Sequence, residues 1–475
     1  MTQYIYEKIA HKISMAIRAG VYSVGEKMPS LRFVSQHYGI SLSTAIQSYQ
    51  LLDNEGYIEA RPKSGYYVKA WMTNYHAEPE PTLSSKTPAT INIGQLALSL
   101  IAESQSKNLI KLGAAVPDQS LLPVRALSRT LAGVARKYSD LPATYEAVNG
   151  SLVLRRQIAR LMRQAGCSCS PQDIVITNGC LEGLTLSLKA ITKHGETVAV
   201  ESPTYFGILQ VLESLGLNAL EIATHSTLGI DPDALQKAIE STQIAACILM
   251  PNFSNPLGSQ MPEANKKRVI EITQQANIPI IEDDVHGALG YQLPRSKALK
   301  AYDKNNNVIL CSSFSKTIAP GYRIGWVLTS RYIQQIEYHK FLENISTATL
   351  PQLAFAEFLA KGGFQRAVQH SIKTYRTRME KMRRIISQKF PTETRISDPS
   401  GGFVLWVELP KTIDCMTLYK KALNKNIAIS PGILFSPRAE YKNHIRLNCA
   451  ATEEEKMEFA LIVLGNLVFE MLESR

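Results

Sequence analysis

The segment Ser312–Gly325, SSFSKTIAPGYRIG, decides what the larger part of this chain is. Lys316 lies among small hydroxyl residues, and a Pro-Gly break leads to Arg323, seven residues further on. A buried amine close to a guanidinium has its ammonium form disfavoured, which is what Schiff-base chemistry requires of a lysine. The hydroxyls of Ser313 and Ser315 can donate to a phosphate, and the guanidinium of Arg323 can bind one as a fork. The segment therefore predicts a reactive lysine beside a phosphate site, with an ordinary solvated lysine as the alternative.

Other segments place functional groups where strands are expected to end. "VITNGCLEGL" puts Gly179 and Cys180 at a strand-to-helix junction, where free N–H groups and the helix dipole favour a phosphate. "ESPTYFG" sets Tyr205 where its ring can stack on a heteroaromatic group, and "PNFSNPLG" offers Asn255 on a turn. "IPIIEDDVHG" ends a buried strand with two carboxylates, the first being Asp283, which is typical of ligand sites in open α/β sheets. A turn glycine, a core tyrosine and a helix-capping aspartate are the alternatives.

The chain as a whole is predicted to be an α/β protein of more than one domain. Its 475 residues exceed what one hydrophobic core usually organises, and 45% apolar with 20% charged residues is ordinary for a globular protein. Short β-branched runs such as "TVAVES", "PIIEDD" and "VILCSS" alternate with helical stretches, which indicates a mostly parallel sheet built of βαβ units.

Membrane and metal functions find no support in the sequence. No apolar run approaches the roughly 20 residues of a membrane-spanning helix, and the N-terminus lacks the apolar block of a signal peptide, so a cytoplasmic location is expected. Seven cysteines are scattered without paired Cys-x-x-Cys spacing, which predicts reduced thiols and no metal site.

A boundary is expected near the beginning of the chain. Residues 73–92, TNYHAEPEPTLSSKTPATIN, contain three prolines and show no apolar period, which indicates a linker. The sequence therefore predicts a small domain over residues 1–72 and a large one over 93–475.

The small domain has the pattern of a winged helix-turn-helix. Two helices are predicted in direct succession, in "PSLRFVSQHYG" and "SLSTAIQSYQLLDNEG". In the second, Ala45, Tyr49 and Leu52 recur at helical spacing and should face inward. The segment "YIEARPKSGYYVK" predicts a two-stranded wing.

The residues expected to contact a nucleic acid belong to three elements of this domain. The outer face of the second helix carries short polar side chains that can reach groove edges and phosphates. The net charge of +11 alone is weak evidence, because residues 1–72 hold eight Lys and Arg against five Asp and Glu. The candidates are Arg32, Ser43, Thr44, Gln47, Arg61, Lys63 and Gly65. A purely structural helical domain is the alternative.

The segment Gly25–Val68 resembles the winged-helix domain of GntR-type bacterial transcription regulators. The resemblance implies that the protein binds double-stranded DNA, and Arg32 occupies the "PSxR" position that the family uses against DNA. One position departs from the family, since Leu42 stands where an arginine is common just after the serine that opens the recognition helix.

Together, the segments of the large domain resemble the fold-type I aminotransferases that use pyridoxal 5′-phosphate. The resemblance implies a mostly parallel central sheet with a smaller α+β subdomain. Lys316 would form the Schiff base with the cofactor, and Asp283 would pair with the pyridine nitrogen. Arg446, in "NHIRLNCA", would bind a substrate carboxylate, and Tyr145 would reach the cofactor phosphate of the other subunit of a homodimer. Asn255 would contact the ring oxygen, Tyr205 the ring face, and the phosphate would be held by Gly179, Cys180, Ser313, Ser315 and Arg323.

Two positions of the large domain depart from the aminotransferase pattern. His286 stands where the family has a tyrosine that binds the ring oxygen, and Cys180 stands where a hydroxyl residue is common. Both make efficient transamination less certain than cofactor binding, so the sequence leaves open whether the protein is an enzyme.

A GntR-type winged helix joined to an aminotransferase-like domain resembles the MocR branch of bacterial regulators. In that branch the enzyme fold chiefly serves as a sensor, so the resemblance implies a DNA-binding regulator that responds to the cofactor and to an amino acid or amine. A working aminotransferase with an accessory DNA-binding head is the main alternative. A pure interaction protein is less favoured, because Lys316 and Asp283 are both kept.

Overall fold

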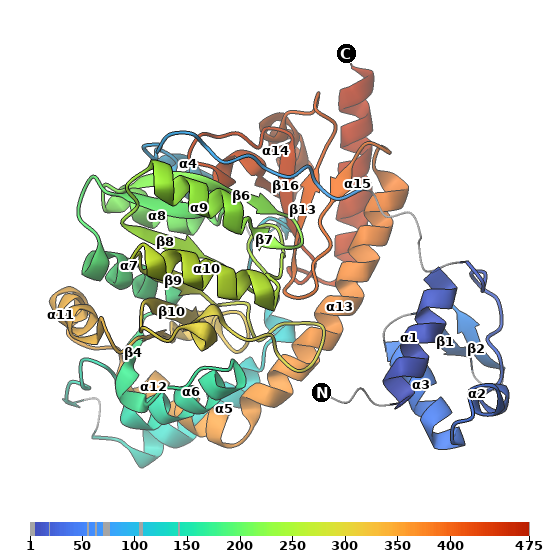
Figure 1. Ribbon diagram of the computed structural model, residues 1–475, viewed down its shortest axis with the longest axis horizontal. Helices are drawn as coiled ribbons and strands as arrows, with labels where there is room; N and C mark the ends of the chain where they lie inside the picture. Colours follow the sequence, from blue (N-terminus) through green and yellow to red (C-terminus); the bar gives the residue numbers. More distant parts are fainter. Residues whose placement is uncertain are drawn as a thin grey trace. The chain divides into compact units, whose positions relative to one another are not determined.

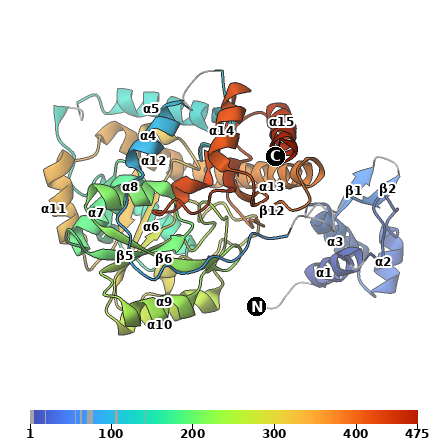
Figure 2. The same cartoon turned by 90° about the horizontal axis from the view of Figure 1, so that it is seen from above.

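The computed structural model describes residues 5–18, 20–54, 57–61, 64–69, 77–103, 108–140 and 143–474. The chain divides into two compact units, Met1–Tyr75 and His76–Arg475, which Figures 1 and 2 show from two directions. Lys63 and the first residues of the expected linker, 73–76, lie outside the described residues.

The small unit has the helices and the hairpin that the sequence predicts. Helices α1 (Ile5–Arg18), α2 (Leu31–His37) and α3 (Leu42–Asn54) precede strands β1 (Ile58–Arg61) and β2 (Gly65–Val68), which pair antiparallel. The inward positions are confirmed, since Ala45, Tyr49 and Leu52 are fully buried among the apolar residues of α1. The Tyr49 hydroxyl donates to the Pro29 carbonyl at 2.8 Å, which ties α3 to the start of α2.

The large unit is built on an eight-stranded sheet of order β4-β11-β10-β9-β8-β5-β6-β7. The neighbours from β10 to β6 are parallel, whereas β11 is antiparallel to both of its neighbours and β7 to β6, so the predicted mostly parallel sheet is confirmed. The strands are β4 (Ile174–Thr177), β5 (Thr197–Ser202), β6 (Asn218–His225), β7 (Gly229–Ile230), β8 (Ala246–Leu249), β9 (Ile280–Asp283), β10 (Val308–Ser313) and β11 (Gly325–Leu328).

Helices cover both faces of this sheet because its strands are apolar on both sides. Residues of α7 and α8 pack on one face and residues of α9 and α10 on the other, as Figure 2 shows. The helices of the sheet layers are α4 (Gly94–Glu103), α5 (Val124–Lys137), α6 (Leu152–Gln164), α7 (Cys180–Ile191), α8 (Phe206–Ser214), α9 (Pro232–Ser241), α10 (Glu263–Gln275), α11 (Ile333–Asn344) and α12 (Thr349–Ala360). Short 3₁₀ helices are η1 (Gln119–Leu121), η3 (Pro171–Asp173), η4 (Leu299–Tyr302), η5 (Pro320–Tyr322) and η6 (Gly432–Phe435).

A smaller α+β part follows along the chain, as the sequence predicts. The long helix α13 (Gly363–Lys389) packs beside α15 (Glu454–Glu473). In the order of the chain, α14 (Cys415–Asn424) comes after the second strand of a four-stranded sheet and before the third. That sheet has the order β12-β13-β16-β15, and β14 pairs with β3 from the start of the unit. The strands are β3 (Ile110–Lys111), β12 (Arg395–Ile396), β13 (Val404–Glu408), β14 (Ile427–Ala428), β15 (Ser430–Pro431) and β16 (His444–Asn448).

The described part of the expected linker, residues 77–92, lies along the large unit instead of forming a free coil. Ala89 exchanges two backbone hydrogen bonds with Ala219 of β6, at 2.8 and 3.0 Å, and the Ser85 N–H donates to the Glu221 carbonyl at 2.9 Å. The physical reason is the edge of the sheet: β6 pairs with β5 on one side, but β7 is only two residues long and leaves most of the other side of β6 unpaired by a strand.

Three further observations concern membrane spans, metal ligands and cysteines. No helix of the described residues is long and apolar enough to cross a membrane. The same residues contain no group of three His, Cys, Asp or Glu side chains able to hold a metal ion. All seven cysteines are free thiols.

Candidate functional site

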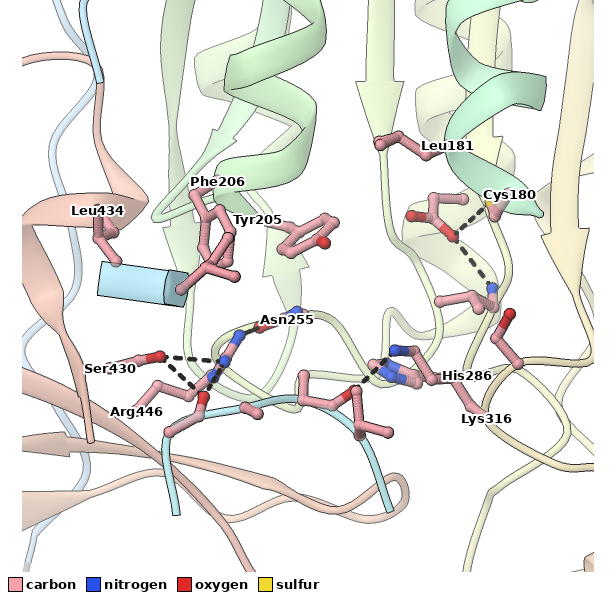
Figure 3. A pocket seen from close by; sticks show the side chains of 18 of the residues that line it. Cys180, Leu181, Tyr205, Phe206, Asn255, His286, Lys316, Ser430, Leu434 and Arg446 are labelled. Carbon is pink, nitrogen blue, oxygen red and sulfur yellow. Dashed lines mark hydrogen bonds between the residues drawn. The ribbon is translucent and has the colours of Figure 1, made fainter. Parts of the chain in front are cut away.

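A cavity of about 450 Å³ opens where the parallel strands of the large sheet end. Figure 3 shows its lining from close by. The structure brings together at this cavity ten of the twelve residues predicted for the large domain, namely Cys180, Tyr205, Asn255, Asp283, His286, Ser313, Ser315, Lys316, Arg323 and Arg446. Gly179 lies next to it as the N-cap of α7, whereas Tyr145 does not line it and is 80% exposed.

Lys316 follows β10 and has the electrostatics of a reactive amine. Its Nζ donates to the carbonyl of Ala115 at 2.7 Å, which holds the side chain in the cavity. Burial, and secondarily the positive charge of Arg446, lower the pKa of Lys316 to about 8. About a tenth of the lysine is therefore the neutral, nucleophilic amine at pH 7, far more than at the ordinary pKa of a lysine.

Asp283 is the last residue of β9 and presents a buried carboxylate to the cavity. Its Oδ1 accepts from the Val285 N–H at 3.1 Å and from the Cys180 thiol at 3.5 Å. Burial raises the pKa of Asp283 to about 6, and the two hydrogen bonds oppose this rise. A cationic group placed against this carboxylate from the cavity side would keep it ionised.

The N-terminus of α7 and Arg323 together form a site for an anion. Gly179 is the N-cap with φ +87°, and no side chain caps this helix end. Arg323 has a left-handed backbone (φ 54°), and its Nη2 donates to the carbonyl of Asn178 at 2.9 Å. Free N–H groups of the first helical turn and a guanidinium at the same point attract a phosphate.

Arg446 of β16 is the most buried cation of the cavity. It is 1% exposed; its Nη1 donates to Asn255 Oδ1 at 2.9 Å, and its Nη2 donates to the Ser430 hydroxyl at 3.2 Å and to the carbonyl of Gly113 (Figure 3). Its Nε is buried without a partner, and burial lowers the pKa of Arg446 to about 10. Because its hydrogen-bond partners are neutral oxygens, the guanidinium is suited to take up a carboxylate.

His286 keeps an imidazole where the resemblance to aminotransferases implies a phenol. Its Nδ1 lies 3.0 Å from the Phe253 carbonyl, and burial lowers the pKa of His286 to about 3. A carbonyl only accepts, so the neutral ring carries its proton on Nδ1 and Nε2 is an acceptor. That Nε2 is buried without a partner, which makes it available to a ligand hydroxyl.

Some residues of the cavity have no counterpart in the sequence analysis. The loop Gly113–Val116 contributes the carbonyls that bind Arg446 and Lys316, and Phe206 and Leu434 add apolar wall. A side chain at position 113 would lie 2.4 Å from the backbone carbon of Ile429, so the loop needs glycine there. The run "GAAV" at residues 113–116 was the one available signal, because small residues permit close backbone approach.

The residues predicted to contact DNA lie on α2, α3 and the hairpin of the small unit. Arg32, Ser43 and Gln47 are exposed. The hydroxyls of Ser43 and Thr44 each lie 2.8 Å from the Ser41 hydroxyl at the start of α3.

The hairpin residues have partners of their own. Arg61 pairs with Glu59 at 2.8 Å and stacks over the Tyr67 ring at 4.3 Å, and Gly65 has a φ of +104°. The structure thus shows an exposed polar face on α3, with the positive charge of Arg61 partly balanced.

Two family models match the chain, one for each unit. Residues 5–68 match the bacterial regulatory proteins of the gntR family, and residues 107–464 match aminotransferase class I and II.

Curated relatives have the same two parts over nearly their whole length. The HTH-type transcriptional regulator YjiR of Escherichia coli (strain K12) is 36% identical over 98% of this chain and 99% of its own. YdcR of the same organism is 34% identical over the same shares, and NorG of Staphylococcus aureus (strain USA300) is 27% identical over 92% and 98%.

Solved structures of aminotransferases resemble the large unit. The α-aminoadipate aminotransferase LysN of Thermus thermophilus, complexed with N-(5'-phosphopyridoxyl)-L-leucine, matches with a TM-score of 0.74 and 25% identity over 79% of this chain and 98% of that one. The kynurenine aminotransferase of Pyrococcus horikoshii matches with a TM-score of 0.74 and 27% identity over 79% and 95%.

Proposed function

The chain belongs to the aminotransferase class I and II family. We propose that its aminotransferase-like domain serves as the sensor of a MocR-type transcription regulator. Its relatives YjiR and YdcR are named HTH-type transcriptional regulators, and they share both units with it. The observation that carries the proposal is that a chain with a gntR-type DNA-binding unit keeps Lys316, Asp283 and Arg446 together at one cavity. DNA binding is then controlled by pyridoxal 5′-phosphate together with an amino acid or amine.

The residues of the cavity fit pyridoxal 5′-phosphate. Lys316 would bind its carbonyl carbon, and Asp283 would face the pyridine nitrogen, whose positive charge offsets the burial that raises the pKa of this carboxyl. Its phosphate would lie at the start of α7, against Arg323. When bound, the cofactor supplies an electron sink for an attached amino compound. The remaining contacts would come from Tyr205 at the ring face, Asn255 and His286 at the ring oxygen, and Cys180, Ser313 and Ser315 at the phosphate.

The phosphate site yields a test that does not involve the effector. An alanine Cβ at position 179 would lie 2.2 Å from Arg323 Nη2, so Gly179→Ala must displace the guanidinium from α7. Because a hydrogen bond to a charged group is worth about 1.5–3 kcal/mol, we expect cofactor affinity to fall about 10- to 100-fold. Titration of the cofactor-free protein with pyridoxal 5′-phosphate, followed by intrinsic fluorescence, measures this.

Gly195→Ala is the matched control for this variant. Gly195 has nearly the same φ, +85°, but a Cβ there would meet nothing within 4 Å. Both variants place a side chain at a positive φ, which L residues adopt only with strain, but only Gly179→Ala also displaces Arg323. Equal cofactor affinity in the two variants would remove Arg323 from the phosphate site.

A homodimer completes the proposal. Tyr145 is 80% exposed and does not contribute to the cavity of its own chain, as expected of a residue that reaches the phosphate of a partner's cofactor. Helix α11 also exposes Tyr338, Phe341 and Leu342 at 61%, 51% and 62%, which is an apolar face suited to burial against a second copy.

The DNA-binding unit can be tested in the full-length chain. Arg32 is exposed at the start of the helix-turn-helix, and we expect Arg32→Ala to remove one phosphate contact. Each lost phosphate contact lowers the slope of log affinity against log salt by about 0.9. Gel-shift titrations at several salt concentrations, with the promoter upstream of the protein's own gene, measure this slope.

Lys12→Ala is the control for charge. Lys12 is exposed on α1, outside the helix-turn-helix, so its removal takes the same charge from the same unit without a predicted phosphate contact. We expect the wild-type salt slope for this variant.

Gln47→Ala should instead reduce discrimination between DNA sites of different sequence, because a glutamine side chain reads base edges. A DNA affinity that does not change with salt concentration would contradict the assignment of this unit as the DNA-binding domain.

A working aminotransferase is the second candidate function. The lowered pKa of Lys316 and the nearby carboxylate of Asp283 are equally suited to amino-group exchange. This candidate would be favoured over the regulator if the protein converts an amino acid to its oxo acid and its affinity for DNA does not change when that amino acid is added.

A further inference from the structure

We infer that the effector is an α-amino acid with an uncharged, apolar side chain. The inference rests on the proposed effector function of the cavity and names the chemical class of ligand that it takes. It is carried by the wall that surrounds Arg446, because the carboxylate clamp fixes where the rest of a bound amino acid must lie.

The ring of Phe206 and the side chain of Leu434 form the first part of this wall, and the fully buried ring of Phe435, which does not line the cavity, packs against Phe206. The guanidinium carbon of Arg446 lies 6.0 Å from the centre of the Phe206 ring and 5.1 Å from that of Phe435. The two rings contact each other edge to face, with centres 5.7 Å apart. Leu434, which precedes Phe435 in η6, also lines the cavity beside Phe206 (Figure 3). The side chain of an amino acid whose carboxylate is bound by Arg446 would therefore contact apolar carbon atoms.

Helix α4 supplies the second part of the wall. Leu100 and Ile101 line the cavity from its last turn. The helix is anchored at its start on α8, where the carboxylate of Glu213 accepts from the N–H groups of Ile93 at 3.1 Å and Gly94 at 2.9 Å. The wall is therefore held in place by a capping contact rather than by a ligand.

The loop that binds Lys316 and Arg446 closes the same side. Val116 lines the cavity, and its carbonyl accepts from Asn448 Nδ2 at 3.0 Å. Asn448 Nδ2 also donates to the carbonyl of Ala114, so one buried amide holds the loop at two points. The apolar wall thus joins four separate segments of the chain, namely α4, the loop Gly113–Val116, α8 and η6.

The charges of the cavity exclude a second acidic group on the ligand. Among the described residues that line it, the cations are Lys316, Arg323 and Arg446, and each already has a place in binding the cofactor or the first carboxylate. The polar side chain that α8 contributes, Gln210, is uncharged. A second carboxylate would lose its hydration without gaining a cationic partner, which is costly.

The test is a series of amino acids titrated into the full-length protein loaded with pyridoxal 5′-phosphate, by calorimetry and by the change in its visible spectrum. From alanine through 2-aminobutyrate to norvaline, affinity should rise about fourfold per methylene as apolar surface is buried. Glutamate, which is close to norleucine in size, should bind at least about tenfold more weakly than norleucine. Equal or tighter binding of glutamate, or a flat series, would overturn the inference.

A variant that introduces a positive charge tests the position of the wall independently. Ile101→Arg places a guanidinium at the cavity wall and should raise the affinity for glutamate relative to norleucine by about tenfold or more. Ile101→Gln, which changes shape without charge, should not. Leu98→Arg adds the same charge to α4 at a position that is 63% exposed and does not line the cavity, so it should leave the ratio unchanged.

The outcomes separate this inference from the proposed function. If acidic amino acids bind best, the cavity still senses an amino acid and only the assignment of its wall is wrong. If no amino acid of any class binds or changes the spectrum, both the apolar class and the effector function of the cavity are overturned.

Discussion

Replacing Lys316 with alanine is expected to abolish covalent attachment of pyridoxal 5′-phosphate, so that the purified protein changes from yellow to colourless. The reason is local, because Lys316 is the lysine that lines the cavity in the described part of the chain, and burial lowers its pKa to about 8. A neutral amine is required to attack a carbonyl, so the rate of cofactor capture should rise with pH until about pH 8 and then level off. Absorbance after rapid mixing of cofactor with cofactor-free protein follows this rise.

Lys266 provides an internal control for this prediction. It is 1% exposed, and burial likewise lowers its pKa to about 8, but its Nζ is bound to Asn252 Oδ1 at 2.7 Å and to the Ser296 hydroxyl at 3.0 Å, outside the cavity. Borohydride reduction of the loaded protein, digestion and peptide mapping should place the label on Lys316 and none on Lys266. Label on Lys266 would show that a lowered pKa outside the cavity suffices, and label on any lysine other than Lys316 would remove Lys316 from its role.

Arg446→Ala is expected to weaken the binding of an α-amino acid by about 2–4 kcal/mol, since truncation of one partner of a buried charge pair typically costs this much. The guanidinium is nearly fully buried, and its hydrogen-bond partners among the described residues are neutral oxygens. The carboxylate of a bound amino acid would therefore be the first anion to pair with it. The visible band of the bound cofactor should persist, because Arg446 is not assigned to the cofactor. Calorimetric titration of wild type and variant gives the difference.

The decarboxylated analogue of the same amino acid is the sharpest control. An amine without a carboxylate cannot use Arg446, so its affinity should be nearly equal in wild type and Arg446→Ala. Ser430→Ala, which removes one neutral contact of the guanidinium, should cost much less than Arg446→Ala. If the amino acid and the amine lose affinity equally, Arg446 is a structural residue and not the carboxylate clamp.

Much of the fold could be predicted because its signals are local. Helical spacing of Ala45, Tyr49 and Leu52 predicts their burial in α3, and each is fully buried. Apolar β-branched runs predict the central strands, and polar groups that interrupt such runs, such as Asp283, predict the edge where a ligand binds. A periodic pattern and an interrupted strand both act over a few residues, so no knowledge of distant contacts is needed.

The path of the chain before α4 could not be predicted from such signals. Residues 77–92 are polar and rich in proline, which is the composition of a linker, yet they lie along β6. Their order comes from hydrogen bonds to an edge strand more than a hundred residues away, such as that of Ser85 to Glu221. Composition carries no information about which remote edge is open.

The sequence by itself determined which reactive groups the proposed site contains, whereas the tertiary structure decided how these groups and the wall around them are placed. Lys316, Asp283 and Arg323 are recognisable from their neighbours in the chain, because a reactive amine, a strand-terminal carboxylate and a guanidinium each follow from residue type and local context, whereas Arg446 was assigned only through the resemblance to aminotransferases. The tertiary structure placed Gly113 against Arg446 and packed α4, α8 and η6 into one wall. Those contacts join residues separated by hundreds of positions, and the apolar character of the wall arises only when they meet, since Leu100, Phe206 and Leu434 alone are ordinary core residues.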